Sequence, residues 1–132
     1  MLLRIDPRSP DPVFEQLAFQ VKQFVAEGAL APGDKLPSVR ELARELAINP
    51  NTVVRALETL ERDGVILRRQ GAGCFVAERG SDLAERERRR RLDQLVNPAL
   101  TEAFHLGYDP SDVRAALERR LDTLETKTRR QR

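Results

Sequence analysis

Apolar side chains recur every three or four positions in several stretches of the first half of the chain, which predicts amphipathic helices. The first stretch starts at Asp11 and Pro12, a capping residue followed by a proline at the first helical position, and it ends at Gly28. The second starts at Ser38, and Glu41 three residues later completes a capping box. We therefore expect one helix to begin after the Asp11 cap and another after the Ser38 cap.

A third apolar stretch starts at Asn49 and Pro50, again a cap followed by a proline, and it ends at Gly64. Only residues 47 and 48 separate it from the second stretch, and two short helices joined so tightly form a helix-turn-helix unit. The side of the third helix that we expect to be buried carries Val53, Ala56, Leu57 and Leu60.

The hydrophobic pattern changes period after Gly64, where residues 65–69 and 74–76 form two short β-rich runs around a glycine-containing turn. We expect a hairpin that extends beside the third helix. Three helices followed by a hairpin are typical of a winged helix-turn-helix. The predicted fold class is α+β, mostly α, with this domain over residues 1–79 and a short all-helical dimerisation segment over residues 80–132.

The last third of the chain carries three helical stretches. Residues 82–96 are highly charged, and their run 85–91 is either a solvated helix face or a further set of phosphate contacts. Cap-and-proline pairs at residues 97–98 and 109–110 predict two more helix starts, and Gly107 ends the first of these helices. Apolar spacings of four, four and three along the last helix form a narrow seam suited to a partner helix. The residues that we expect in a dimer interface are Leu100, Phe104, Val113, Leu117, Leu121 and Leu124.

Composition narrows the classes of function. A chain of 132 residues is long enough for one domain with an appendage, which excludes most large enzyme architectures. A single cysteine, Cys74, excludes an internal disulfide and a cysteine-based zinc site, and His105 is the single histidine. We expect no catalytic site, no metal and no cofactor. The chain has no apolar run of membrane-spanning or signal-peptide length, so we expect a cytoplasmic protein with no membrane partner.

The net charge of +2 is too small to indicate a nucleic-acid partner. The argument for DNA binding therefore depends on where the polar side chains lie. On the third helix, Asn51 and Arg55 fall opposite the buried stripe and Thr52 flanks it. Amide and guanidinium groups read base edges in the major groove. Val54 is off the stripe and suits either a thymine methyl or packing under the hairpin. A solvated helix face for Arg55 and a capping role for Asn51 are the alternatives.

Phosphate contacts are expected from the preceding helix and from the hairpin. Arg40 lies in the first turn of the second helix, which crosses the DNA backbone in this class of domain, and the Ser38 cap leaves N–H groups at the helix start. Each of these phosphate contacts has an alternative. Arg40 could form an ion pair with a neighbour on its own helix, and the hairpin arginines could protect an exposed strand from pairing with another chain. The hairpin residues that suit phosphate or minor-groove contact are Arg68, Arg69, Gly71 and Gly73.

Residues 36–46, 49–64 and 71–76 together resemble the GntR family of bacterial transcription regulators, and the resemblance covers residues 11–77. The start of the third helix and the short C-terminal segment are similar to the YtrA-like subfamily, whose C-terminal part is a small helical dimerisation module. The resemblance implies a dimeric, effector-responsive protein, usually a repressor, that binds a near-palindromic operator. The positions that match DNA contacts of the family are Arg40, Thr52 and Gly71.

The chain departs from the family pattern at a few positions. Many members carry arginine where this chain has Pro50 and Val54, and here Arg55 follows one residue later. Cys74 replaces the threonine that is common after the hairpin turn, and we expect a packed thiol there.

The residues and the resemblance predict a sequence-specific DNA-binding regulator, a repressor, that acts as a homodimer. We expect the third helix in the major groove, the hairpin in the minor groove, and two half-sites about 34 Å apart. A small-molecule effector is implied by the resemblance alone. The alternative is a winged-helix module that binds proteins and does not bind DNA.

Overall fold

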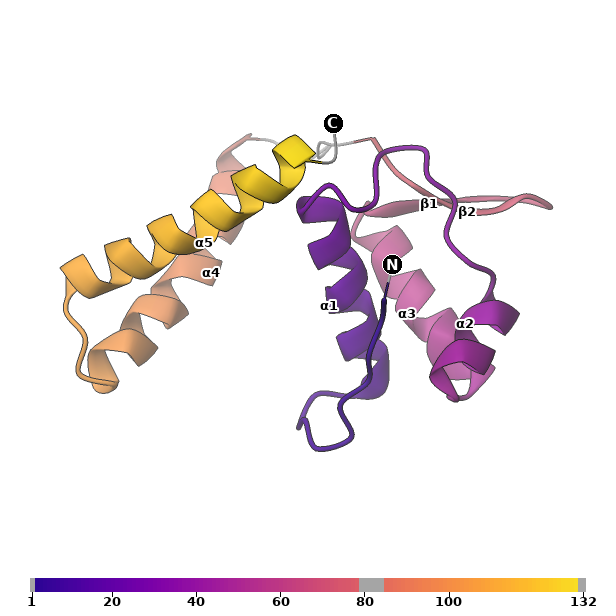
Figure 1. Cartoon of the computed structure of the whole chain (residues 1–132), viewed down its shortest axis with the longest axis horizontal. Helices are drawn as coiled ribbons and strands as arrows, with labels where there is room; N and C mark the ends of the chain where they lie inside the picture. Colours follow the sequence, from indigo (N-terminus) through magenta and orange to yellow (C-terminus); the bar gives the residue numbers. More distant parts are fainter. Residues whose placement is uncertain (1, 79–84, 131–132) are drawn as a thin grey trace. The chain divides into compact units, whose positions relative to one another are not determined.

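The computed structural model describes residues 2–78 and 85–130, with the backbone alone for residues 127–130. Two compact units divide the chain between residues 79 and 80, and each is described by itself. The first unit contains three helices and a hairpin, and the second contains two helices, so the predicted α+β class with an excess of helix is confirmed (Figure 1).

In the first unit, helix α3 (Pro50–Arg62) packs against α1 (Val13–Ala26) and α2 (Val39–Leu46), and also against strand β1 (Ile66–Arg69). Strand β2 (Gly73–Val76) completes the hairpin. Their apolar faces form a single core, which includes all four residues expected on the buried side of α3. The buried residues are Leu17, Ala18, Val21, Leu36, Leu42, Ala43, Val53, Ala56, Leu57, Leu60, Ile66 and Val76.

The helix-turn-helix is set by local hydrogen bonds at both helix starts. The hydroxyl oxygen of Ser38 accepts from the Glu41 N–H at 3.1 Å, and the Asn49 side-chain oxygen accepts from the Asn51 N–H at 2.8 Å. Between the helices, Ala47 adopts a left-handed conformation with φ of 53°, and the Ile48 N–H donates to the Ala43 carbonyl. Both predicted starts, and the short link between the two helices, are confirmed.

The expected start of α1 is wrong in detail, because Pro12 rather than Asp11 is its N-cap and no side chain caps the helix. The Asp11 backbone is engaged elsewhere: its N–H donates to the Ser9 hydroxyl, and its carbonyl accepts from the Gln16 side-chain amide. This amide also bonds the backbone of Asp6. The N-terminal segment is therefore held along α1 by the Gln16 side chain, and the helix begins without a side-chain cap.

The hairpin has antiparallel register Ile66 to Val76 and Arg69 to Gly73, so residues 70–72 form the turn. Gly73 therefore belongs to a strand, whereas the sequence pattern assigned it to the turn. A third segment joins the sheet, because Lys35 forms an isolated bridge with Phe75 on the free side of β2. This addition connects the hairpin to the chain just before α2.

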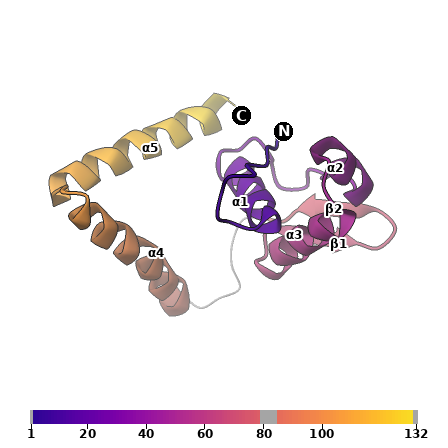
Figure 2. The ribbon, with the colours of Figure 1, turned by 90° about the horizontal axis from the view of Figure 1, so that it is seen from below.

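The second unit consists of α4 (Glu85–His105) and α5 (Pro110–Arg130), which diverge from the turn that connects them (Figure 2). The α5 start is confirmed, since the Asp109 carboxylate accepts from the Asp112 N–H and Asp112 accepts in return from the Asp109 N–H. No residue of α4 is buried in the part of the chain that the structure describes. No described helix has the length and apolar character needed to cross a membrane.

The predicted helix start at Asn97 and Pro98 is wrong, because α4 continues through Pro98. A proline inside a helix lacks one N–H donor and costs about 3 kcal/mol relative to alanine. The apolar positions Leu92, Val96 and Leu100 stand four residues apart across it, so an unbroken helix keeps them on one face. The structure therefore has one continuous helix with one apolar face where the local signal predicted a new start.

Candidate nucleic-acid interface

Helices α2 and α3, which pack against each other, each expose a polar side chain near the start. Arg40 is exposed in the first turn of α2, and Asn51 is exposed in the first turn of α3. Thr52 and Val54 are half-buried beside them. The opposite side of α3 is completely covered by the core, so this helix has one face available for a ligand. The candidate residues on the starts of both helices are therefore at least partly accessible, and that they act together in one DNA interface stays a prediction.

Arg55 is exposed, but its guanidinium lies over the ring of Phe14 in α1, 3.9 Å from the ring centroid. Such a cation–π contact fixes the direction of a long side chain and contributes about 0.5–1 kcal/mol at an exposed site. The sequence did not reveal this neighbour, because Phe14 is 41 positions away along the chain. The Phe14 ring thus lies beside Arg55 on the α1 side of α3.

Ser38 carries two hydrogen bonds within the α2 capping box. Its hydroxyl accepts from the Glu41 N–H and donates to the Glu41 carboxylate, each at 3.1 Å. A hydroxyl has one donor and two acceptor sites, so one acceptor site remains after these two bonds. The main role of Ser38 in this structure is to hold the start of α2, and with it Arg40, in place.

Different constraints favour glycine at the two glycine positions of the hairpin. The Ala72 N–H donates to the Arg69 carbonyl to close the turn, and Gly71 has a φ of 77° at the position where such a turn needs a left-handed residue. A Cβ on Gly71 would touch nothing within 4 Å. Gly73 has a φ of 111°, and a Cβ there would lie 3.1 Å from Cε of Lys35. The turn therefore requires Gly71, and the crossing lysine adds a second reason for Gly73.

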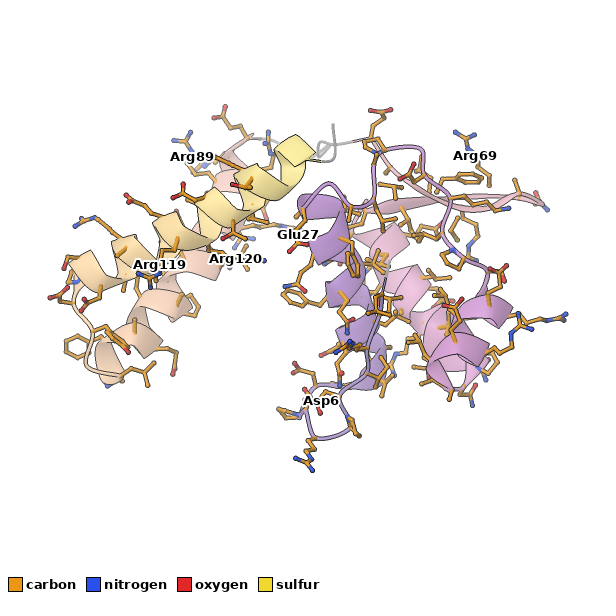
Figure 3. The ribbon with its side chains drawn as sticks, viewed as in Figure 1. Asp6, Glu27, Arg69, Arg89, Arg119 and Arg120 are labelled. Carbon is orange, nitrogen blue, oxygen red and sulfur yellow. The ribbon has the colours of Figure 1, made fainter. Side chains whose placement is uncertain are left out.

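Lys35 is a cation of this region that the sequence pattern did not single out. Its side chain crosses the start of β2, and its backbone pairs with Phe75. Arg69 lies over the ring of Phe75 from the neighbouring strand, with 5.2 Å between the guanidinium carbon and the ring centroid (Figure 3). No periodicity in residues 31–37 announces a strand, so only the folded sheet reveals this neighbour.

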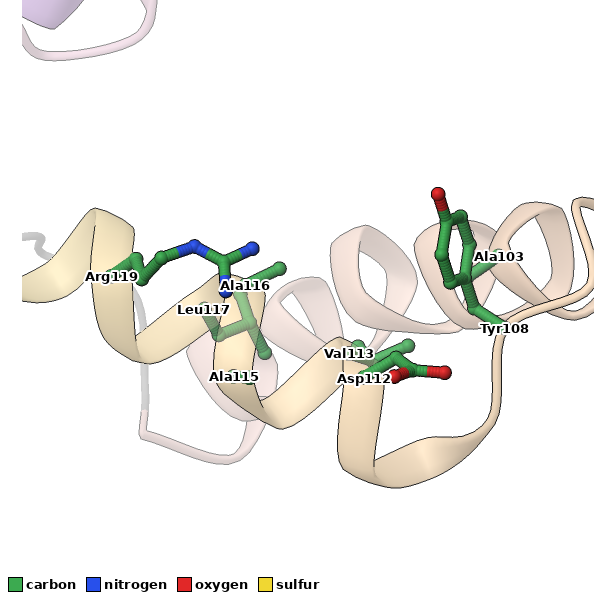
Figure 4. Close-up of a pocket in the computed structure, with 8 residues that line it drawn as sticks. All are labelled: Ala103, Tyr108, Asp112, Val113, Ala115, Ala116, Leu117 and Arg119. Carbon is green, nitrogen blue, oxygen red and sulfur yellow. The ribbon is translucent and has the colours of Figure 1, made fainter.

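The second unit carries apolar side chains that the chain itself leaves uncovered. Leu100, Phe104, Leu117 and Leu121 are exposed, with Phe104 at 73% of its full area, whereas Val113 and Leu124 are half-buried. Val113 and Leu117 line a groove of about 480 Å³ together with Tyr108, Asp112 and Arg119 (Figure 4). Four of the six residues expected in a dimer interface are thus exposed, and Val113 and Leu117 line the groove.

The arginine-rich start of α4 is partly neutralised by its own glutamates. Glu87 accepts from Arg90 at 2.6 Å and from Arg91 at 3.3 Å, and Glu85 accepts from Arg89 at 3.0 Å. The hydrogen bonds from Arg90 and then Arg91 lower the pKa of Glu87 from 4.5 to about 2. These pairs favour the interpretation of this segment as a solvated helix face.

The described residues contain no group of histidine, cysteine, aspartate or glutamate side chains that could hold a metal ion. What the fold and the exposed α2–α3 surface define is a winged helix-turn-helix, a class of small domain that presents one helix to the major groove of DNA.

Comparisons with known proteins agree with this class. The family described as "Bacterial regulatory proteins, gntR family" matches residues 14–76. The transcriptional repressor YtrA of Bacillus subtilis is 36% identical over 82% of this chain and 83% of its own length. The structure of YtrA from Sulfolobus acidocaldarius, a GntR-family transcription factor, has a TM-score of 0.63 and 35% identity, covering 76% of this chain and 99% of that one. A Listeria monocytogenes structure described as a transcriptional antiterminator has a TM-score of 0.82 at 27% identity, covering 94% and 93% of the two chains.

The chain belongs to the gntR family of bacterial regulatory proteins. It is a DNA-binding regulator of transcription, and among its relatives the similarity to YtrA extends beyond the winged helix-turn-helix into the C-terminal helices.

Proposed function

We propose that this protein represses transcription by binding a near-palindromic operator as a homodimer. The observation that carries the proposal is the contrast between the two sides of α3. One side is buried throughout, and the other opens with exposed Asn51, while Arg40 is exposed in the first turn of α2. In this class of domain the first turns of the second helix of the pair meet base edges. The similarity to a transcriptional repressor over most of both chains supports the direction of regulation.

Within this complex we assign α3 to the major groove and the hairpin to the minor groove. Asn51, Thr52, Val54 and Arg55 would meet base edges, and Arg40 with the start of α2 would meet a phosphate. The turn and strands of the hairpin would approach the flanking backbone, where its glycines permit close approach. The DNA interface expected from the sequence comprises Ser38, Arg40, Asn51, Thr52, Val54, Arg55, Arg69, Gly71 and Gly73.

The homodimer would form through α4 and α5. An isolated helix pair whose apolar residues face water lacks the burial that stabilises helices in proteins. A second copy supplies a surface of the same composition, as twofold interfaces require. The proposed interface comprises Leu100, Phe104, Val113, Leu117, Leu121 and Leu124. A monomer with one recognition helix would also bury too little surface for tight specific binding, so two copies reading two half-sites are needed.

An unidentified small-molecule effector would act through this C-terminal unit. Dimer geometry sets the separation of the two α3 helices, and hence the match to half-sites about 34 Å apart. A ligand that binds one dimer geometry better than another would therefore change operator affinity.

Selection of bound sequences from random duplex DNA tests the proposal. The expected result is enrichment of an inverted repeat whose half-sites are about one helical turn apart, bound with an affinity that falls steeply with salt. Asn51→Ala should relax selectivity at one base pair of each half-site, and Arg62→Ala, at the far end of α3, is the matched control. Absence of salt-dependent duplex binding would contradict the proposal and favour a protein-binding module.

A further inference from the structure

The register of the hairpin separates its two consecutive arginines onto opposite faces. Side chains alternate between the faces of a strand. Arg68 pairs with Cys74, next to the pair of Ile66 and Val76. Ile66 and Val76 are buried and Cys74 packs against the core. We call this side, which turns toward the helices, the inner face.

The outer face carries Leu67, Arg69, Phe75 and Lys35. Leu67 is 49% exposed, so this face does not contribute to the core. The Arg69 guanidinium lies 5.2 Å from the Phe75 ring centroid, on the side of the hairpin away from α2 and α3 (Figure 3). Arg69 therefore has an aromatic neighbour within the hairpin and points away from the helix-turn-helix.

Arg68, by contrast, lies in the same cross-strand row as the segment that leads into α2. The Leu36 N–H donates to the Cys74 carbonyl, so residues 36, 74 and 68 stand side by side on three adjacent strands. Two interstrand spacings put the Arg68 backbone about 10 Å from that of Leu36, two residues before the Ser38 cap. Arg68 is exposed, and none of the described residues forms an ion pair or side-chain hydrogen bond with it.

We infer that Arg68, on the inner face, is the hairpin arginine that contacts DNA, and that Arg69 instead braces the outer face through Phe75. This inference rests on the proposed DNA-binding function and replaces Arg69 by Arg68 in the proposed interface. Arg68 and Arg40 then border one region between the hairpin and the start of α2. Two guanidinium groups on its two sides suit a single DNA backbone segment.

Fluorescence anisotropy on the full-length chain tests the inference. The probes are a labelled duplex with the sequence selected by the wild-type protein and a scrambled duplex of equal length. We expect Arg68→Ala to weaken binding to the selected duplex at least tenfold and to reduce the slope of log affinity against log salt by about one. Arg69→Ala should cost at most threefold. Arg62→Ala, which removes an exposed arginine at the end of α3, controls for loss of charge alone.

The outcomes separate this inference from the proposed function. Thermal unfolding confirms that each variant folds, and Arg68→Gln, which keeps the aliphatic stem, replaces Arg68→Ala if that variant is destabilised. A loss with Arg69→Ala equal to or larger than the loss with Arg68 variants would overturn the inference, as would wild-type binding by both variants. A wild-type chain that selects no duplex would instead overturn the proposed function, and the inference with it.

Discussion

The two helix pairs of this protein, α2–α3 and α4–α5, differ in how much of their apolar surface is buried. The pair with the shorter helices is the more deeply buried one. Helix α2 has 8 residues and α3 has 13, yet they contribute half of the twelve buried apolar residues of the described chain. Helices α4 and α5 have 21 residues each, and α4 has no buried residue. A helix is stabilised mainly by a surface that covers its apolar face, and within the first unit α1 and the hairpin supply that surface to α2 and α3.

This difference assigns separate tasks to the two pairs. The short pair is rigid enough to present polar groups at fixed positions, as a base-reading surface requires. The long pair keeps its apolar groups exposed and is completed in the proposed dimer by a second copy. In the proposed complex the first pair would therefore provide recognition, and the second would determine how far apart the two recognition surfaces lie.

The largest expected difference between the two helix pairs is in the stability lost when a leucine is replaced by alanine. Leu60 is completely buried in α3, so Leu60→Ala should lower the free energy of unfolding by about 2–5 kcal/mol. The matched change Leu121→Ala removes the same atoms from a side chain that is 53% exposed and should cost less than about 1 kcal/mol in dilute monomer. Urea denaturation at low chain concentration measures both. Equal losses would show that the two pairs do not differ as described.

The next effect is on assembly. Leu117→Glu with Leu121→Glu introduces two charges into the proposed dimer surface and should weaken self-association at least a hundredfold, which is about 2.7 kcal/mol. Phe19→Glu is the control, because Phe19 is 60% exposed on α1 in the first unit and lies outside that surface. Sedimentation equilibrium distinguishes the two variants. Loss of dimer with Phe19→Glu alone would move the interface to the first unit.

A smaller effect concerns base reading by the first pair. Arg55→Ala should weaken binding to the selected operator by about 1–3 kcal/mol and relax selectivity at one base pair. Binding of wild type and variant to a set of singly substituted duplexes measures this. A uniform loss over all duplexes would make Arg55 a phosphate contact, and no loss would make it a partner of Phe14 only.

The smallest effect concerns charge at the start of α4. Arg90 and Arg91 hold the pKa of Glu87 near 2, below its usual value of 4.5, so its ionised form stabilises the helix above pH 4.5. This contribution should disappear as the pH falls through 2. Circular dichroism should therefore show slightly less helix for Glu87→Gln than for wild type at pH 6, and no difference below pH 2. A constant difference would exclude these ion pairs as its cause.

Much of the first unit follows from short-range signals. The caps Ser38 and Asn49 act within three residues of themselves, and the apolar stripe of α3 is a simple period, so the sequence predicts both. The neighbours of the candidate site are long-range. Nothing local predicts that Phe14 lies beside Arg55, or that Lys35 joins the edge of the hairpin.

The errors at Asp11 and Pro98 have a common physical origin. In each case a local start signal competes with a more extended arrangement. Gln16 bonds the backbone of Asp11 and so holds the N-terminal segment in a different path. The apolar face of α4 runs through Pro98 without interruption. A proline marks a permitted helix start, and the interactions on both sides of it decide whether that start is used.

The stoichiometry of the protein on its selected operator duplex, measured by sedimentation equilibrium, tests the account most directly. We predict two chains per duplex, with at least a hundredfold weaker binding for the chain carrying Leu117→Glu and Leu121→Glu. One chain per duplex, bound equally well by wild type and by this double variant, would contradict the account.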